Sequence, residues 1–87
     1  MTKVKTSSGF ECEIDEKNLD DMRLLDLVAE VSEGNTAKLP AIINRVLGDE
    51  KGKLYKHIED EHGRVPVEKA SDEITEIFRK ISTGKNS

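Results

Sequence analysis

The sequence predicts an α+β domain that is mostly helical, with an N-terminal β-hairpin packed on a bundle of about four helices. Near the N-terminus, apolar and charged residues alternate with the period of a strand. Beyond residue 18 the apolar residues recur at three- and four-residue spacings, which is the period of a helix. A chain of 87 residues suffices for one domain with a modest core. We expect a single domain over 1–82 and a mobile polar tail over 83–87.

The hairpin is expected over residues 3–14. Phe10, Cys12 and Ile14 alternate with glutamates, which indicates a half-buried strand, and Val4 lies in a shorter partner strand. The segment 6–9 supplies the turn, where Gly9 can adopt positive φ. Because a two-stranded hairpin is marginal in water, its apolar face must pack on the helices.

Four helices are expected over 19–33, 38–47, 50–62 and 66–81. Asn18 is the expected N-cap of the first, and Thr36 that of the second. The first helix carries two apolar faces, one of which comprises Leu24, Leu27, Val28 and Val31, and the other Met22, Leu25 and Ala29. A helix that is apolar around so much of its girth is either central to its domain or faces a partner.

Composition excludes several classes of function. Charged residues make up 37% of the chain and the net charge is −4, without a basic stripe or aromatic platform for nucleic acid. The apolar runs are too short to span a membrane, and residues 1–4 lack the character of a signal peptide. With a single cysteine, the chain fits a reducing cytoplasm.

The polar residues do not form a pattern typical of metal binding or catalysis, so we expect no metal, no cofactor and no enzymatic activity. His57, Glu61 and His62 lie close together, but a zinc site needs three or four ligands at recognisable spacing. Cys12 lies on the apolar face of the hairpin, where a cysteine acts as a small hydrophobe.

The acidic clusters and glycines are equally uninformative about chemistry. The clusters at 15–16, 20–21 and 59–61 lack the alternating ligand pattern of a calcium loop. Helix capping and solubility explain them better. Gly48, Gly52 and Gly63 are too dispersed for a phosphate-binding loop.

A surplus of apolar residues remains. In the simpler interpretation all of them close one core. In the functional one, part of this surface receives an amphipathic partner helix or a second subunit. The strongest apolar rows on the first and last helices define the candidate partner-binding residues, which are Leu24, Leu27, Val31, Ile74, Phe78 and Ile81.

The order and spacing of several segments resemble the small tail assembly chaperones of long-tailed phages and prophages of Gram-positive bacteria. The resemblance covers nearly the full chain and rests on Gly9-Phe10 after the turn, Leu19-Asp20-Asp21-Met22-Arg23-Leu24-Leu25-Asp26-Leu27-Val28-Ala29-Glu30, Val46-Leu47-Gly48, Leu54-Tyr55-Lys56-His57-Ile58, Gly63-Arg64-Val65-Pro66 and Glu73-Ile74-Thr75-Glu76-Ile77-Phe78.

The resemblance implies a non-enzymatic protein of the bacterial host cytoplasm that is absent from the mature virion. It would hold the tape measure protein, a long and largely helical chain, and help to recruit the tail tube protein. Two alternatives stay open, a small regulatory or inhibitory module of the antitoxin or anti-repressor kind, and a minor structural piece of the virion. The apolar first helix also leaves room for a homo-oligomer.

Overall fold

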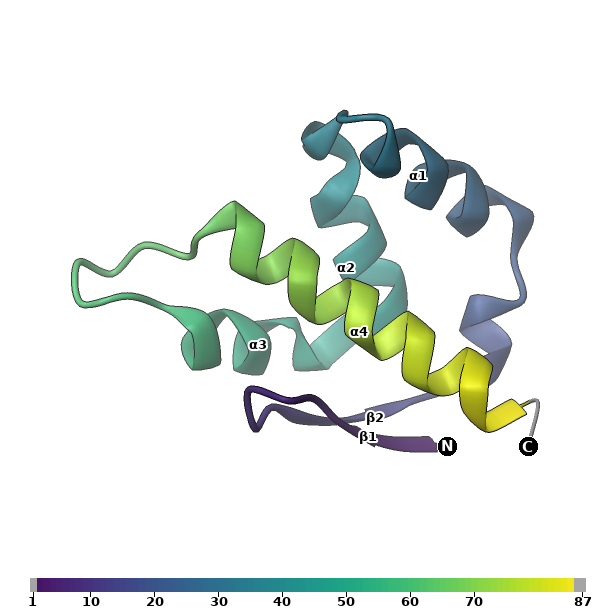
Figure 1. Cartoon of the computed structure of the whole chain (residues 1–87), viewed down its shortest axis with the longest axis horizontal. Helices are drawn as coiled ribbons and strands as arrows, with labels where there is room; N and C mark the ends of the chain where they lie inside the picture. The colour runs from purple at the N-terminus through teal and green to yellow at the C-terminus, as the bar shows by residue number, and fades with distance from the viewer. Residues whose placement is uncertain (1, 86–87) are drawn as a thin grey trace.

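The structure is a computed structural model that describes the backbone of residues 2–85 and the side chains of residues 2–81. A β-hairpin precedes four α-helices, and short 3-10 turns lie before three of these helices (Figure 1). The elements in order are β1 Thr2–Lys5, β2 Glu11–Ile14, η1 Glu16–Leu19, α1 Met22–Ser32, η2 Thr36–Lys38, α2 Leu39–Leu47, η3 Gly48–Glu50, α3 Lys51–Ile58 and α4 Val67–Lys85. The α+β class with an N-terminal hairpin is confirmed.

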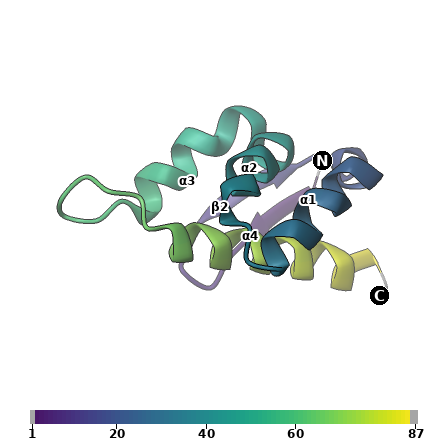
Figure 2. The same cartoon turned by 90° about the horizontal axis from the view of Figure 1, so that it is seen from above.

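The hairpin forms the floor of the molecule. Seen from above, α4 runs along one side, and α2 with α3 lies along the other (Figure 2). Contacts agree with this view, because α4 packs on β1 whereas α2 packs on β2. The extensive contacts of α1 are with α2 and η2, so α1 is attached mainly to one wall of the molecule.

The expected alternation in the hairpin is present. β1 and β2 are antiparallel, with Val4 opposite Cys12, and the side chains of Val4, Phe10, Cys12 and Ile14 are buried. The turn closes through a bond from the Thr6 N–H to the Phe10 carbonyl (2.8 Å), and Gly9 adopts a φ of 94°. This backbone conformation favours glycine, as the sequence predicts.

Charged residues protect the two edges of this small sheet. Lys3 faces Glu13 and Lys5 faces Glu11 across the strands, and opposite charges in this register stabilise the pair. The outer Glu13 N–H donates to the Glu50 carboxylate (2.8 Å), and Lys80 Nζ donates to the Lys5 carbonyl (2.5 Å). Both edges thus have backbone groups covered by side chains, which disfavours pairing with another strand.

The core consists mostly of aliphatic side chains from every α-helix and from the hairpin, to which Phe10 and Cys12 are added. The side chains with 2% exposure or less belong to Ile14, Leu24, Ile42, Ile43, Leu54 and Ile77. Leu24 is the fully buried residue of α1, and Leu27, Val28 and Val31 pack against the core from half-buried positions. Five buried residues of α2, by contrast, make it the central helix.

The first helix begins later than expected. Asp21, not Asn18, is its N-cap, and the Asp21 carboxylate accepts from the Arg23 N–H (2.9 Å). Residues 16–19 form a separate 3-10 turn that Asp15 caps, because two consecutive stretches each supply their own capping aspartate. At the other end, Gly34 with a φ of 104° lets the Asn35 N–H bond the Glu30 carbonyl (2.9 Å).

The second and third helices also differ from expectation at their ends. Thr36 makes no side-chain cap, and η2 leads directly into α2. The predicted helix over 50–62 ends at Ile58, because Asp60 Oδ1 accepts from the backbone N–H groups of His62 and Arg64 (2.9 Å each). Such an aspartate turn competes with the helix for the same backbone groups.

The last helix is longer than predicted. It extends to Lys85, so the backbone of residues 83–85 continues α4 and does not form the expected tail. The remainder of that tail, residues 86 and 87, lies outside the described residues.

The anchoring of α1 gives a first prediction. Leu24→Ala removes the one fully buried side chain of this helix and should lower the free energy of unfolding by about 2–5 kcal/mol. Met22→Ala, at a side chain 69% exposed, should change it by less than ~0.5 kcal/mol. Urea denaturation of both variants is the measurement, and equal losses would contradict this attachment of α1.

Candidate functional site

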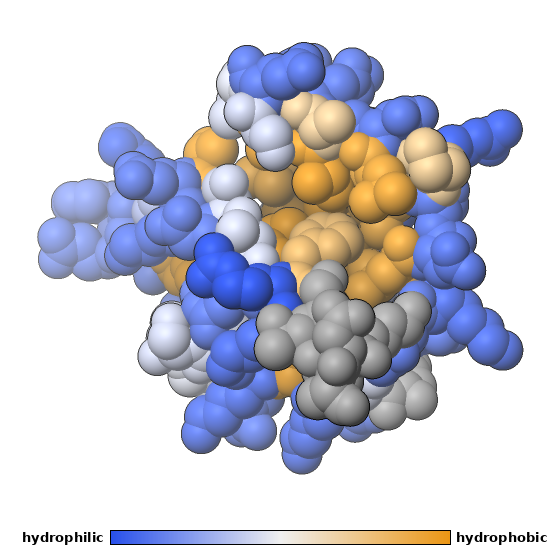
Figure 3. All heavy atoms as spheres, turned by 45° about the vertical axis from the view of Figure 1, so that its right-hand side comes forward, coloured by the Kyte–Doolittle hydropathy of each residue, from blue (hydrophilic) through white to orange (hydrophobic). Residues whose placement is uncertain are grey.

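An apolar hollow opens between α1 and α4. Its volume is about 150 Å³, and its floor includes Leu39 and Ile42 of the central helix. The side of the molecule turned forward in Figure 3 shows an apolar, hollowed area with hydrophilic residues above it and on both sides. We call this feature the α1–α4 groove, and its lining residues are Val28, Val31, Ser32, Leu39, Ile42, Ser71, Ile74, Thr75 and Phe78.

The groove exists because α1 and α4 pack on different parts of the core. α1 contacts α2 and η2, while α4 contacts β1 and α3. The α4 wall includes the short side chains of Ser71 and Thr75, which leave space where larger ones would reach across. A cavity of ~150 Å³ accommodates a group the size of benzene, so the hollow suits one large apolar side chain of a partner.

The structure brings the two predicted apolar rows together around this groove. Val31 and Phe78 are half-buried and face it from opposite walls, and Ile74 lies at its base with 4% exposure. Leu24 (0% exposed) and Ile81 (5%) are core residues, and Leu27 is half-buried against the core. The role of these six residues in partner binding stays a prediction, but only the half-buried ones offer surface to a partner.

The second apolar face of α1 is exposed beside the groove. Helical rows of i, i+4 residues place Leu25 and Ala29 next to Val28 and Ser32. Leu25 is 49% exposed and Met22, one row further, is 69% exposed. The apolar surface therefore continues from the hollow onto the outside of α1, an extension that the two-faced sequence pattern indicates.

A second apolar hollow of about 230 Å³ lies on the other side of Leu39, where η2 and α2 meet α3 and the start of α4. It includes Tyr55, Val65 and Ala70, and Val67 at its edge is 56% exposed. No sequence pattern indicates this hollow, because its lining residues come from five different segments.

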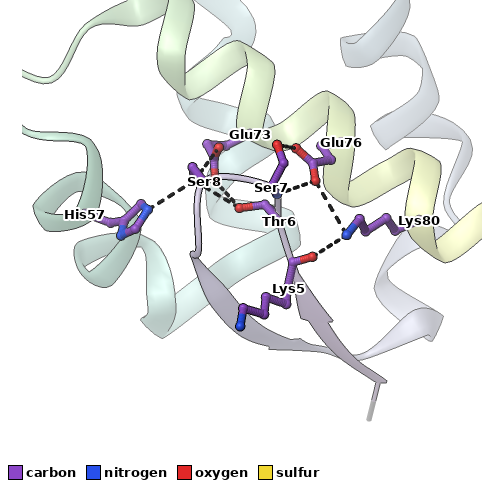
Figure 4. A network of polar contacts seen from close by, with 8 residues as sticks. All are labelled: Lys5, Thr6, Ser7, Ser8, His57, Glu73, Glu76 and Lys80. Atoms are coloured by element: carbon purple, nitrogen blue, oxygen red, sulfur yellow. Dashed lines mark hydrogen bonds and ion pairs between the residues drawn. The ribbon is translucent and has the colours of Figure 1, made fainter.

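A polar cluster joins the hairpin turn to α4 (Figure 4). The buried carboxylate of Glu73 accepts from the hydroxyls of Thr6 (2.8 Å) and Ser8 (2.9 Å). One turn further, the Glu76 carboxylate accepts from the N–H (2.6 Å) and hydroxyl (2.8 Å) of Ser7. We call these five residues the turn cluster. Sequence reasoning missed it, because its members lie more than 60 residues apart.

With His57 beside it, the turn cluster places a serine, a histidine and a carboxylate close together, but in an order unlike a catalytic triad. In a triad the carboxylate orients the histidine, which takes the proton of the serine. Here the Ser8 hydroxyl donates to the Glu73 carboxylate (2.9 Å) and shares a hydrogen bond with His57 Nε2 (3.1 Å), so the carboxylate contacts the serine and not the histidine. His57 also packs on the Phe10 ring, with centroids 5.6 Å apart. These contacts fasten the hairpin turn to α4 and α3.

The other candidates considered for chemistry are dispersed. His62 contacts Glu61 (3.7 Å), whereas His57 bonds Ser8, so these residues do not converge. Over the residues that the structure describes, no three His, Cys, Asp or Glu side chains form a metal-ligand group. Within the same part of the chain, no helix combines the length and apolar character needed to cross a membrane.

Comparisons of the chain with protein-family models, with curated proteins and with solved structures found no match. The interpretation of the groove therefore rests on its own geometry.

The Glu76 contacts predict an acid-sensitive attachment of the hairpin turn. Hydrogen bonds from Ser7 lower the pKa of Glu76 below its ordinary value. A carboxyl group whose pKa is depressed by folding stabilises the folded state above its unfolded pKa of about 4.3, and this contribution is lost as the pH falls through the folded pKa. Glu76→Gln should therefore lower stability at pH 7 and flatten its decline below about pH 4.3.

Thermal unfolding between pH 7 and pH 3 measures this effect. The matched control is Asp72→Asn, which removes an exposed carboxylate of the same helix without removing a hydrogen bond. Identical pH profiles for the two variants would contradict a specific role of Glu76.

Burial of Cys12 predicts that its thiol reacts slowly with alkylating reagents. Desolvation, followed by the nearby charge of Glu50, raises the pKa of Cys12 from 9.0 to about 11. At pH 8 the thiolate fraction should fall about 100-fold below that of the unfolded chain, and alkylation by iodoacetamide should slow at least as much. Mass spectrometry of native and urea-unfolded protein measures the two rates, and similar rates would show that Cys12 is accessible in the fold.

Proposed function

We propose that this protein is a small binding protein whose α1–α4 groove receives apolar side chains of a helical partner. The observation that carries the proposal is the continuity of apolar surface from the hollow, through Val28, to the exposed Leu25 and Met22. Monomeric proteins rarely leave such a rimmed apolar patch open unless it binds something.

The shape of this surface favours a helix as the partner. The groove lies between two helices, and a partner helix in such a groove is recognised by apolar residues at i, i+3, i+4 and i+7. The hollow would hold one anchoring side chain, and the outer row of α1 would contact the neighbouring turns. The edges of the sheet are less suited to binding an extended peptide, because Glu50 and Lys80 occupy backbone groups there.

Such binding matches what the family resemblance implies. We propose that the partner is the tape measure protein, whose long helices expose apolar stripes until the tail tube encloses them, and that the tail tube protein is recruited to the same complex. A net charge of −4 would keep the complex soluble while the stripes are covered. The protein would act in the host cytoplasm and leave before the virion matures.

Affinity capture with the proteins encoded beside this gene tests the proposal. The tagged chain should co-purify with a very long helical protein from the next large open reading frame. Ser32→Phe, which fills the hollow from an exposed position, and Leu25→Glu should each reduce capture at least about fivefold.

Val67→Glu is the matched control for Leu25→Glu, because it places the same charge at a comparably exposed position outside the groove. Thermal melts verify that all three variants fold. A tight one-to-one complex with an adjacent toxin or repressor would replace the proposal with the regulatory alternative. Detection of the chain in purified virions by mass spectrometry would favour a structural component.

A further inference from the structure

We infer that α1 is a movable wall of the α1–α4 groove, which detaches from α2 as a unit while the hairpin, α2, α3 and α4 stay folded. The inference rests on the proposed function for the role of the groove, and it adds how that groove opens. It is carried by the small buried surface of α1, by the caps within its own segment and by the joints on either side of it.

α1 buries fewer side chains than the other helices, although it is strongly apolar. One of its eleven residues, Leu24, is fully buried, whereas α2 buries five of nine and α3 two of eight. Figure 1 shows α1 at the edge of the molecule beside α2, and its extensive contacts are with α2 and η2. Elements with little burial open at lower free energy than the core, so α1 is the helix expected to open first.

The polar tie between α1 and α2 is weak. Asp21 Oδ2 pairs with Arg45 Nη1 at 3.1 Å, and the two side chains are 38% and 43% exposed. Ion pairs at this exposure contribute little to stability. The closed position of α1 therefore depends on Leu24 and on its half-buried apolar neighbours in the same helix.

α1 carries the caps of both its ends within its own segment. The Asp21 carboxylate accepts from the Arg23 N–H (2.9 Å), and the Asn35 N–H donates to the Glu30 carbonyl (2.9 Å). Neither bond uses a group from α2, α3, α4 or the hairpin. The helix would therefore leave its place without exposing new backbone groups at its ends.

Short irregular segments join α1 to fixed parts of the fold. Asp20 (φ −89°, ψ 66°) separates it from η1, and Asn35 (φ −85°, ψ 75°) separates it from η2. η1 packs on α2, and the Thr2 hydroxyl donates to the Glu16 carboxylate of η1. Because a few residues at the end of an element suffice as a hinge, Asp20 and Asn35 define the two joints.

Opening would change the capacity of the groove. The hollow of about 150 Å³ admits one large side chain while α1 supplies Val28 and Val31 as a wall. With α1 detached, the floor residues Leu39 and Ile42 and the α4 wall would be uncovered. A partner helix would then seat several apolar side chains, and the return of α1 would favour its release.

Native-state hydrogen exchange of the whole chain, followed by NMR at increasing urea, tests the inference. A detached helix of eleven residues is marginal in water, so its amides exchange while α1 is open. The amides of residues 26–32 should share one opening constant, at least about tenfold greater than those of α2 and α4, with a weaker urea dependence. A single constant for all four helices would overturn the inference. Protection that merely declines towards one end of α1 would also overturn it, since that pattern indicates fraying.

Two core substitutions separate a moving α1 from general unfolding. Ile77 of α4, with 0% exposure, belongs to the part that stays folded. Ile77→Val should therefore speed exchange in α2 and α4 about two- to tenfold and leave the opening constant of α1 unchanged. Leu24→Ala removes the buried contact of α1 and should abolish protection there, while α2 and α4 stay protected. Equal acceleration of all helices in the first variant, or joint loss of protection in the second, would overturn the inference.

The outcome is separable from that of the proposed function, because exchange is measured on the chain alone. If α1 opens independently but no tape measure protein is captured, the movable wall stands and the chaperone role fails. If the long helical protein is captured but α1 exchanges together with α2, the chaperone role stands and this inference fails.

Discussion

The structure depends on the packing of α4 against the N-terminal hairpin. A two-stranded sheet of four-residue strands has too little buried surface to persist alone. α4 packs on β1 and supplies part of the missing cover, and the turn cluster fastens the two elements by hydrogen bonds to Glu73 and Glu76. The buried Glu73 carboxylate is tolerable only because two hydroxyls satisfy its oxygens. The first and last parts of the chain are thus held together, with α2 and α3 completing the core from the other side.

Because α4 packs against the hairpin, it does not cover the neighbouring face of α1. That helix is held through Leu24 and its contacts with α2 and η2, and its remaining apolar residues stay near the surface. The cost of exposing Leu25 and Met22 makes sense if a partner covers them part of the time. A binding protein that must later release its partner gains from a small groove, because a larger apolar interface would be harder to dissociate. The same arrangement explains why the surrounding surface is so densely charged, since charge opposes self-association of the open groove.

Periodicity was enough to predict the α+β class, the hairpin and the existence of all four helices, because each has a clear spacing of apolar residues. The residues at which helices begin and end were harder to predict. Asp21 and Asp60 determine two of these ends through hydrogen bonds from nearby backbone N–H groups to their side chains. Near the first helix, either of two neighbouring aspartates could act as the N-cap. The pattern on α1 showed two apolar faces, but only the fold decides that Leu24 is core while Leu25 is exposed. The turn cluster could not be predicted from the sequence, because nothing in the residues around Glu73 distinguishes it from the solvent-facing glutamates nearby. Both walls of the groove contain residues from the predicted rows, yet their meeting in space is a property of the fold alone.

The central claim is that the α1–α4 groove is the binding surface. Methyl NMR of isoleucine-, leucine- and valine-labelled protein, titrated with an amphipathic helical peptide that carries a leucine stripe, tests it most directly. The account predicts that the methyl signals of Leu25, Val28, Val31 and Ile74 shift together, while those of Val4, Ile14 and Ile58 remain in place. Shifts confined to the hairpin and α3, or none in the groove at saturating peptide, would contradict it.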